Sequence, residues 1–193
     1  RKKSFVLVGA IISLNFIFLP TTWPMAVFVL IHVIATSERI GLNIFRFLLG
    51  VLLISLSYFS VANFLDLKQW NDIYFPFGNM WIIEDFSVFM PLIPIALMLM
   101  YAVYDHFKYY NQKSPISRYK YTFLLVFSLA QLLTVILYMN KNYEYLLLLA
   151  FPVTIILSRM LRFLPKYWMK EASLWIIIAS LVSYRALLQL NLI

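Results

Sequence analysis

Seven continuous apolar runs constrain this chain more than any other feature. They cover residues 5–19, 23–36, 44–64, 86–104, 121–139, 145–161 and 172–190. A helix needs roughly 20 mostly apolar residues to cross a bilayer, so the first two runs are short for a full crossing. Because the apolar residues follow one another instead of alternating with polar ones, the pattern disfavours a β-barrel. We expect an all-α polytopic transmembrane bundle of seven helices, forming one transmembrane domain over residues 1–193.

The composition supports lipid as the solvent for much of the surface. Of the 193 residues, 63% are hydrophobic and only 12% are charged, and the mean hydropathy is +0.85. A soluble domain of this size cannot bury that much apolar surface. The three prolines within predicted helices, Pro91, Pro94 and Pro152, predict kinks.

The basic residues gather in alternate loops and predict the orientation. One set of loops holds thirteen of the 16 Lys and Arg residues: Arg1, Lys2, Lys3, Arg39, Arg46, Lys108, Lys113, Arg118, Lys120, Arg159, Arg162, Lys166 and Lys170. The opposite set holds only Lys68 and Lys141. We therefore place the protein in a bacterial inner membrane, with its N-terminal end and basic loops cytoplasmic and its C-terminus periplasmic. The net charge of +8 is a topology signal, and we expect no nucleic-acid partner.

The largest expected external loop, residues 65–86, is acidic and aromatic. Its candidate contact residues are Asp66, Trp70, Asp72, Trp81, Glu84 and Asp85. The rings suit the headgroup region of a bilayer, where amphipathic side chains gather. One interpretation is an aromatic belt with solvated carboxylates. The other is a shallow periplasmic pocket whose acids bind a cation or a partner's basic group, or deprotonate an acceptor hydroxyl.

Two further candidates lie elsewhere on the expected periplasmic side. Arg185 falls within the last predicted helix, about one to two turns from its outer end, and Glu144 precedes the sixth predicted helix. A charge inside a bilayer is costly, so Arg185 has three options. It extends to the interface, pairs with Glu144 or an acid of the large loop, or binds a lipid phosphate.

The chain offers little for catalysis or metal binding. It has no cysteine, and its two histidines, His32 and His106, lie far apart in the sequence. We therefore expect no metal site, cofactor or catalytic residue. Isolated polar residues within the apolar runs are expected to bridge neighbouring helices; they are Asn15, His32, Asn63, Gln131 and Ser158. The segment "YYNQKSPISRYKY" is interpreted as a basic and aromatic membrane surface that attracts anionic headgroups.

Four segments carry a resemblance to a known family. They are "FRFLLGVLLISLSYFSVANFLDLKQW", "RYKYTFLLVFSL", "NYEYLLLLAFPVTIILSRML" and "PKYWMKEASLWIII". In this order they resemble an uncharacterised polytopic inner-membrane family of Bacteroidota, over residues 44–193. The resemblance implies further helices upstream, and the chain begins "RKKSF" without Met. It implies no activity and no catalytic residue.

These observations favour a non-enzymatic membrane subunit. We expect it to pack with other integral membrane or envelope proteins in a cell-envelope complex and to contact membrane lipids. The main alternative is an enzyme of the periplasmic face that acts on lipid-linked glycans or phospholipids. The second alternative is a small-solute transporter, which the scarcity of glycine makes less attractive because close helix packing depends on small residues.

Overall fold

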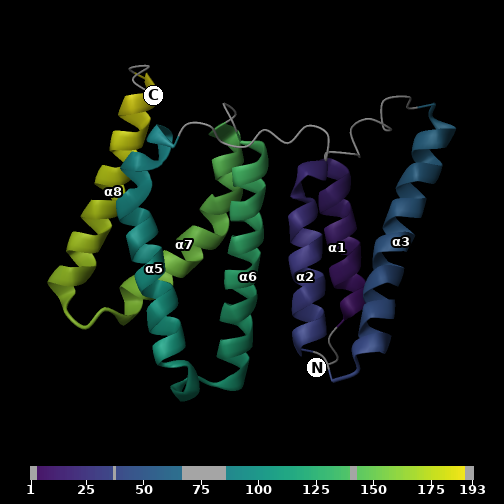
Figure 1. Cartoon of the computed structure of the whole chain (residues 1–193), viewed down its shortest axis with the longest axis horizontal. Coiled ribbons are helices and arrows are strands. Elements are labelled where there is room, and N and C mark those ends of the chain that lie inside the picture. Colours follow the sequence, from purple (N-terminus) through teal and green to yellow (C-terminus); the bar gives the residue numbers. More distant parts are fainter. Residues whose placement is uncertain (1–3, 37, 67–85, 140–142, 190–193) are drawn as a thin grey trace. The chain divides into compact units, whose positions relative to one another are not determined.

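The computed structural model describes residues 4–36, 38–66, 86–139 and 143–189, and these ranges form helices joined by short connections. Their α-helices are α1 (Phe5–Phe18), α2 (Trp23–Thr36), α3 (Ile40–Phe64), α5 (Ile93–Lys108), α6 (Pro115–Tyr138), α7 (Leu146–Phe163) and α8 (Tyr167–Gln189) (Figure 1). Short 3-10 helices flank them: η1 (Pro20–Thr22), η3 (Ser87–Leu92), η4 (Tyr110–Gln112) and η5 (Tyr143–Tyr145). The predicted all-α fold is confirmed.

Five of these helices are long and apolar enough to cross a membrane, counting η3 and η5 residues that lead into α5 and α7. The helices α1 and α2, at 14 residues each, are too short for that criterion, as their apolar runs suggested. Three helices begin earlier than their apolar runs: α3 at Ile40, α6 at Pro115 and α8 at Tyr167. The first turns of these three helices contain polar, basic or aromatic residues. They are helical all the same, because the helix is held by hydrogen bonds between backbone groups, which every residue except proline can donate.

The prolines behave differently from one another. Pro152 lies inside α7, as expected, and is buried; the kink expected there stays a prediction. Pro94 lies not in the interior of α5 but in its first turn, where a missing N–H costs no helical hydrogen bond. Pro91 lies inside η3.

The helices divide into two compact units, which are described separately below. Unit 1 comprises residues 1–82 and 129–145, and unit 2 comprises residues 83–128 and 146–193. The boundary passes through α6 after Ser128. The single transmembrane domain expected from the sequence stays a prediction.

In unit 1, α1 and α3 pack with their backbones in close contact. A Cβ added at Gly9 would overlap the carbonyl oxygen of Phe47, and one added at Gly50 would overlap that of Val6. Ser13 of α1 and Ser55 of α3 also share a hydrogen bond of 2.9 Å between their hydroxyls. Two glycines therefore allow a helix contact that larger residues would prevent.

Polar side chains join the other elements of unit 1. The Asn15 amide donates to the Thr22 hydroxyl at 2.8 Å and closes the turn between α1 and α2. The indole N–H of Trp23 donates to the Tyr138 hydroxyl at 2.8 Å. Gln131, which is buried, donates to the Met25 sulfur at 3.7 Å. The expected bridging role of Asn15 and Gln131 is thus confirmed. The same expectation for Ser158 is wrong, because its hydroxyl donates to the Ile155 carbonyl of its own helix.

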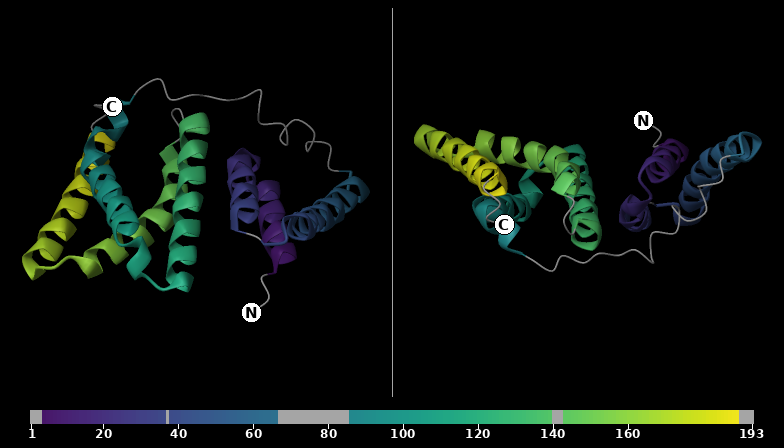
Figure 2. Two further views of the ribbon diagram at one scale, coloured as in Figure 1. Left: turned by 60° about the horizontal axis from the view of Figure 1, so that its bottom comes forward. Right: turned by 90° about the horizontal axis from the view of Figure 1, so that it is seen from above.

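Unit 2 has its own apolar core, formed by side chains of α5, α6 and α7. Its buried members are Ile95, Ala102, Tyr121, Leu125, Ile156, Leu157, Met160 and Leu164. The ribbons of these three helices are drawn from two further sides in Figure 2. The Ser180 hydroxyl of α8 donates to the carbonyl oxygen of Pro91 in η3. Successive helices alternate in direction, so the α5–α6 and α7–α8 connections lie at the same end of unit 2 (Figure 1).

Candidate functional site

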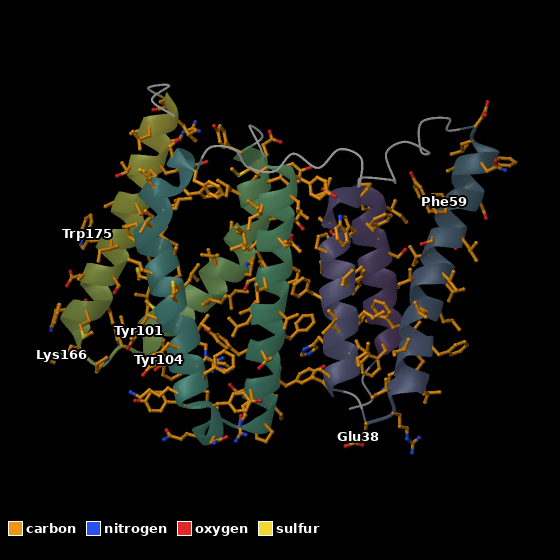
Figure 3. The ribbon with its side chains drawn as sticks, viewed as in Figure 1. Glu38, Phe59, Tyr101, Tyr104, Lys166 and Trp175 are labelled. Carbon is orange, nitrogen blue, oxygen red and sulfur yellow. The ribbon has the colours of Figure 1, made fainter. Side chains whose placement is uncertain are left out.

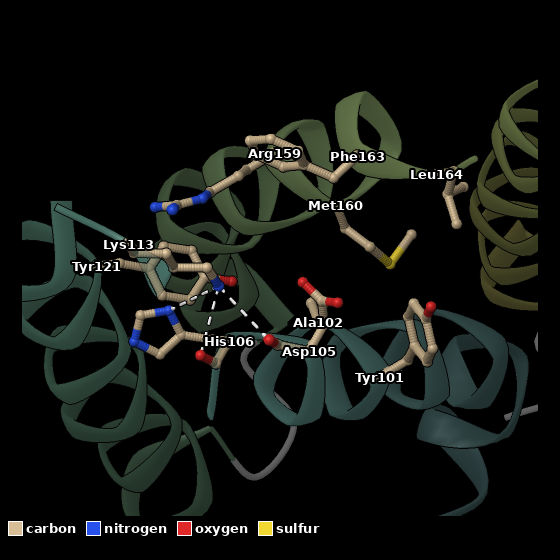
Figure 4. A pocket seen from close by; sticks show the side chains of 10 residues that line it. All are labelled: Tyr101, Ala102, Asp105, His106, Lys113, Tyr121, Arg159, Met160, Phe163 and Leu164. Atoms are coloured by element: carbon tan, nitrogen blue, oxygen red, sulfur yellow. Dashed lines mark hydrogen bonds between the residues drawn. The ribbon is translucent and has the colours of Figure 1, made fainter. Parts of the chain in front are cut away.

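The described part of unit 2 contains a pocket at that end, which we call the Lys113–Arg159 pocket (Figure 4). Its cavity volume is about 30 Å³, and it opens to the protein surface. Its walls come from α5, the α5–α6 connection, α6 and α7: Tyr101, Ala102, Asp105, His106, Lys113, Tyr121, Arg159, Met160, Phe163 and Leu164. Ala102, Met160 and Leu164 belong to the unit 2 core, whereas Phe163 is exposed. The polar part of the pocket therefore lies beside packed side chains.

Lys113 folds back over the end of α5. Its ammonium group donates to the carbonyl oxygens of His106 at 3.4 Å and Asp105 at 3.5 Å. The last carbonyls of a helix have no partner within it, and a cation there also interacts favourably with the helix dipole. The same ammonium group lies 3.5 Å from the Nδ1 atom of His106. Lys113 therefore caps α5 and lines the pocket at once.

Arg118 fixes the connection that carries Lys113. Its guanidinium donates to the carbonyl oxygens of Lys113 at 2.7 Å and Asn111 at 2.9 Å. It also lies over the Tyr110 ring, with 5.1 Å between the guanidinium carbon and the ring centroid. These contacts fix the conformation of the α5–α6 connection, and that conformation positions Lys113.

Arg159 reaches the pocket from α7. Its guanidinium carbon lies 4.3 Å from the centroid of the Tyr121 ring and 5.9 Å from that of Phe163. One N–H group donates to the Ser117 hydroxyl at 3.2 Å. A guanidinium has five N–H groups, and within the described ranges Arg159 makes neither a second hydrogen bond nor an ion pair. It is therefore held by aromatic faces with most of its donors uncommitted.

His106 forms the deepest polar part of the wall. Its side chain is 1% exposed, and its ring packs against Tyr121 with 4.3 Å between the ring centroids. The Nε2 atom has no hydrogen-bond partner among the described residues. A buried nitrogen without a partner costs free energy, so it marks an unusual position in an otherwise packed wall.

The charges of the pocket do not balance. Lys113 and Arg159 supply two cations, whereas Asp105 is the one carboxylate among the lining residues. Burial lowers the pKa of Lys113 below its usual 10.5; Asp105 opposes this shift and Arg159 adds to it. The lowered pKa shows that the protein alone solvates this ammonium less well than water does. An anion placed between the two cations would restore the balance.

The surrounding surface is also basic. The connections and adjacent turns at this end carry Lys108, Lys113, Arg118, Lys120, Arg159, Arg162, Lys166 and Lys170, against the carboxylates Asp105 and Glu171. We call these eight cations the basic end of unit 2. A phosphate group with its oxygens would be attracted to this end and could then bind the Arg159 guanidinium through two parallel hydrogen bonds.

The sequence candidates that the structure describes, Asp66, Glu144 and Arg185, are not among the residues that line this pocket. Asp66 follows the last turn of α3 with a left-handed φ of 52°, the conformation that commonly ends a helix. Glu144 lies in η5 and is exposed, and Arg185 is exposed near the end of α8. Trp70, Asp72, Trp81, Glu84 and Asp85 lie outside the described residues, so their roles stay predictions.

Sequence reasoning had identified the basic loop but not the pocket. The segment from Tyr109 to Tyr121 was interpreted as a membrane surface, and it supplies Lys113 and Tyr121. In the sequence, Arg159 served only as a topology marker and His106 only to discount a metal centre. The available signal was the cation Arg159 near the end of α7, which the sequence could not connect with a loop more than 40 residues earlier. Across the described ranges, no group of three or more His, Asp or Glu side chains could hold a metal ion.

Comparison with known proteins gives one match. A model of a family of unknown function, DUF6427, matches residues 1–192. No curated protein and no solved structure matches the chain. The match covers nearly the whole sequence and extends upstream of the region that carried the resemblance. The chain belongs to the DUF6427 family, whose function is unknown.

Proposed function

We propose that this protein is a non-enzymatic integral subunit of a membrane assembly in the bacterial cell envelope. The observation that carries the proposal is Trp175 of α8, which is 63% exposed and points away from its neighbours (Figure 3). It lies eight residues into the helix, about 12 Å along its axis, which is within the hydrocarbon region if α8 spans. Its indole N–H has no hydrogen-bond partner among the described residues.

An exposed indole N–H at that depth favours a protein neighbour over lipid. Acyl chains offer no acceptor, and an unpaired polar group in hydrocarbon is costly. The hydroxyls of Ser183 and Thr154 avoid this cost by donating to carbonyls of their own helices, which the rigid indole cannot do. A neighbouring membrane protein with an acceptor would satisfy Trp175 and cover its broad apolar ring.

The small share of α8 that the rest of the chain buries also supports a protein neighbour. Only 6% of its most apolar 18-residue window is buried within the chain, against 33% for α6. Most of its surface is therefore open to lipid or to another protein. We propose that a second membrane protein covers the side of α8 that carries Trp175, while lipid covers the rest.

The proposed setting is the inner membrane of a bacterium, with a source among Bacteroidota as the resemblance implies. The gathering of cations at one end of unit 2 supports a cytoplasmic position for that end, since cytoplasmic loops carry an excess of Lys and Arg. The segment 65–86 and the C-terminus are then periplasmic. Arg185 would lie about 6 Å from the end of α8, close enough for its guanidinium to reach the periplasmic interface.

Photo-crosslinking in native membranes tests the proposal. A photoreactive residue at position 175 should give one discrete crosslinked protein, and that protein should co-purify with the wild-type chain in mild detergent. Trp175→Phe removes the indole N–H and keeps a smaller aromatic ring, so recovery of the partner should fall several-fold. Trp168→Phe is the matched control, because Trp168 is also 63% exposed but lies in the first turn of α8.

A monodisperse monomer with no co-purifying protein would count against the proposal. Equal effects of the two tryptophan variants would also oppose it. The enzyme alternative rests chiefly on acids of segment 65–86, and alanine replacement of each acid tests it separately. Normal function in all these variants would reject that alternative.

A further inference from the structure

We infer that the Lys113–Arg159 pocket binds a phosphate-bearing anion, either the headgroup of an acidic phospholipid or free phosphate. The inference is independent of the lateral partner proposed for α8, since the pocket is formed by other helices. It concerns a binding site and involves no chemical reaction. Three observations support it: an unmatched pair of cations, the hydrogen-bond donors that these cations leave uncommitted, and the position of the pocket at one end of unit 2.

The first observation is the excess of positive charge in a sheltered place. Lys113 and Arg159 line one pocket with the single carboxylate Asp105. Neither cation forms an ion pair with any carboxylate in the described ranges. Half-buried cations usually pair with an acid, since desolvation without a partner is costly. The missing negative charge is what an anionic ligand supplies.

The second observation is that the cations are held in place by contacts that leave donors free. Arg159 is fixed by the Tyr121 face, 4.3 Å from its guanidinium carbon, and by one hydrogen bond to Ser117. The remaining N–H groups keep the planar fork that matches two phosphate oxygens. Lys113 makes only long contacts of 3.4 to 3.5 Å, which a phosphate oxygen can replace with a shorter, charge-assisted bond.

The third observation concerns the ligand's source. The pocket lies beside the ends of α5 and α7 (Figure 4), where lipid headgroups meet a spanning helix. Its wall also includes the apolar side chains of Met160, Phe163 and Leu164, and Phe163 is 65% exposed. A phosphate on the cations with acyl chains along this apolar side would match both parts of the wall. Free phosphate would use the cations alone.

Titration of the purified full chain in a neutral detergent tests the inference, with native mass spectrometry as the readout. One arm uses dioleoyl phosphatidylglycerol and the other uses inorganic phosphate. Arg159→Gln and Lys113→Gln should each weaken saturable binding about tenfold or more, which corresponds to about 1.4 kcal/mol. Binding in the first arm alone assigns a lipid headgroup, and equal competition by inorganic phosphate assigns a phosphate site.

Matched controls separate the pocket from general surface charge. Arg162→Gln removes a cation from the same helix as Arg159, and Lys120→Gln removes one near Lys113; both residues are exposed and neither lines the pocket. These variants should retain binding within about twofold. Equal weakening by all four variants would overturn the inference, as would the absence of saturable binding in both arms.

A second variant covers the case in which Arg159→Gln does not fold. Arg159→Lys keeps the charge but loses the planar fork, so affinity should fall several-fold while the unfolding temperature without ligand stays close to wild type. An unchanged affinity in Arg159→Lys and in Lys113→Gln would refute the site.

Discussion

The guanidinium carbon of Arg159 lies 4.3 Å from the centroid of the Tyr121 ring, and the same guanidinium donates to the Ser117 hydroxyl at 3.2 Å. Tyr121 and Ser117 lie one helical turn apart on α6, and Arg159 comes from α7. Arg159 thus links α7 to α6, and some of its N–H groups make no hydrogen bond within the described residues. Because Tyr121 is 4% exposed, its ring is fixed by packing and can hold the guanidinium in one orientation.

Removal of the aromatic face should weaken both the helix contact and the pocket. Tyr121→Leu is expected to lose about 1 kcal/mol of cation–π interaction together with some packing. The unfolding temperature in detergent and the affinity for phosphatidylglycerol should both decrease. Tyr121→Phe keeps the ring, so it should bind like wild type; a large loss of affinity in Tyr121→Phe would show that the hydroxyl, not the ring face, matters.

Substitution at Gly50 should separate α1 from α3. In Gly50→Val the new side chain would overlap the Val6 carbonyl, so we expect a loss of about 3 kcal/mol or more in unfolding free energy. Thermal unfolding in a fixed detergent measures this loss. Gly41→Ala is the control, because nothing lies within 4 Å of an added Cβ there. It should stabilise α3 by up to about 1 kcal/mol, and equal losses in the two variants would contradict the close contact.

The hydroxyl of Ser180 should contribute to the packing of α8 on η3. Its acceptor is the carbonyl oxygen of Pro91, so Ser180→Ala leaves that carbonyl without this partner and should cost about 1 kcal/mol. Ser183→Ala is the matched control three residues later, since Ser183 donates to Ala179 of its own helix. Its unfolding temperature should match wild type, and a smaller effect at Ser180 than at Ser183 would argue against the contact.

Phosphatidylglycerol binding should weaken as the pH rises through the lowered pKa of Lys113. Burial is the main cause of that lowering; Asp105 opposes it, Arg159 reinforces it, and His106 also faces the ammonium group. The charged form binds the anion, so affinity is full below this pKa and decreases above it, beginning at a pH below the usual 10.5.

The Lys113→Arg variant provides the comparison for this pH dependence. Arginine stays charged throughout the accessible range, so the decrease should disappear or move to higher pH. The phosphodiester keeps its charge across the same range, which removes the ligand from the comparison. Titrations at a series of alkaline pH values give the two profiles, and identical profiles would exclude Lys113 as a ligand of the phosphate group.

Much of the architecture could be predicted from the sequence because each spanning helix needs a continuous apolar run. The starts of α1 and α2 were predicted to the residue, at Phe5 and Trp23. Those of α3, α6 and α8 were placed too late, because polar and aromatic first turns are helical as well. The bridging roles of Asn15 and Gln131 followed from the cost of an unpaired polar group among apolar helices.

The pocket could not be predicted in the same way. The segment carrying Lys113 and Tyr121 was identified as basic and aromatic, but its partner Arg159 lies on another helix. When cations are only counted on each side of the membrane, Arg159 and Arg162 contribute equally to the predicted orientation. The fold distinguishes them: Arg159 packs over Tyr121, whereas Arg162 is exposed.

The sequence by itself determined that the chain is a bundle of apolar helices, since hydrophobicity acts on each segment independently of its neighbours. The direction in which those helices cross a membrane stays a prediction from the charges of the loops. Tertiary structure decided which helices touch, because packing depends on shape at particular positions, such as the Gly9 and Gly50 contacts. It also decided which of many similar cations share a pocket, since that depends on distances between segments far apart in the chain.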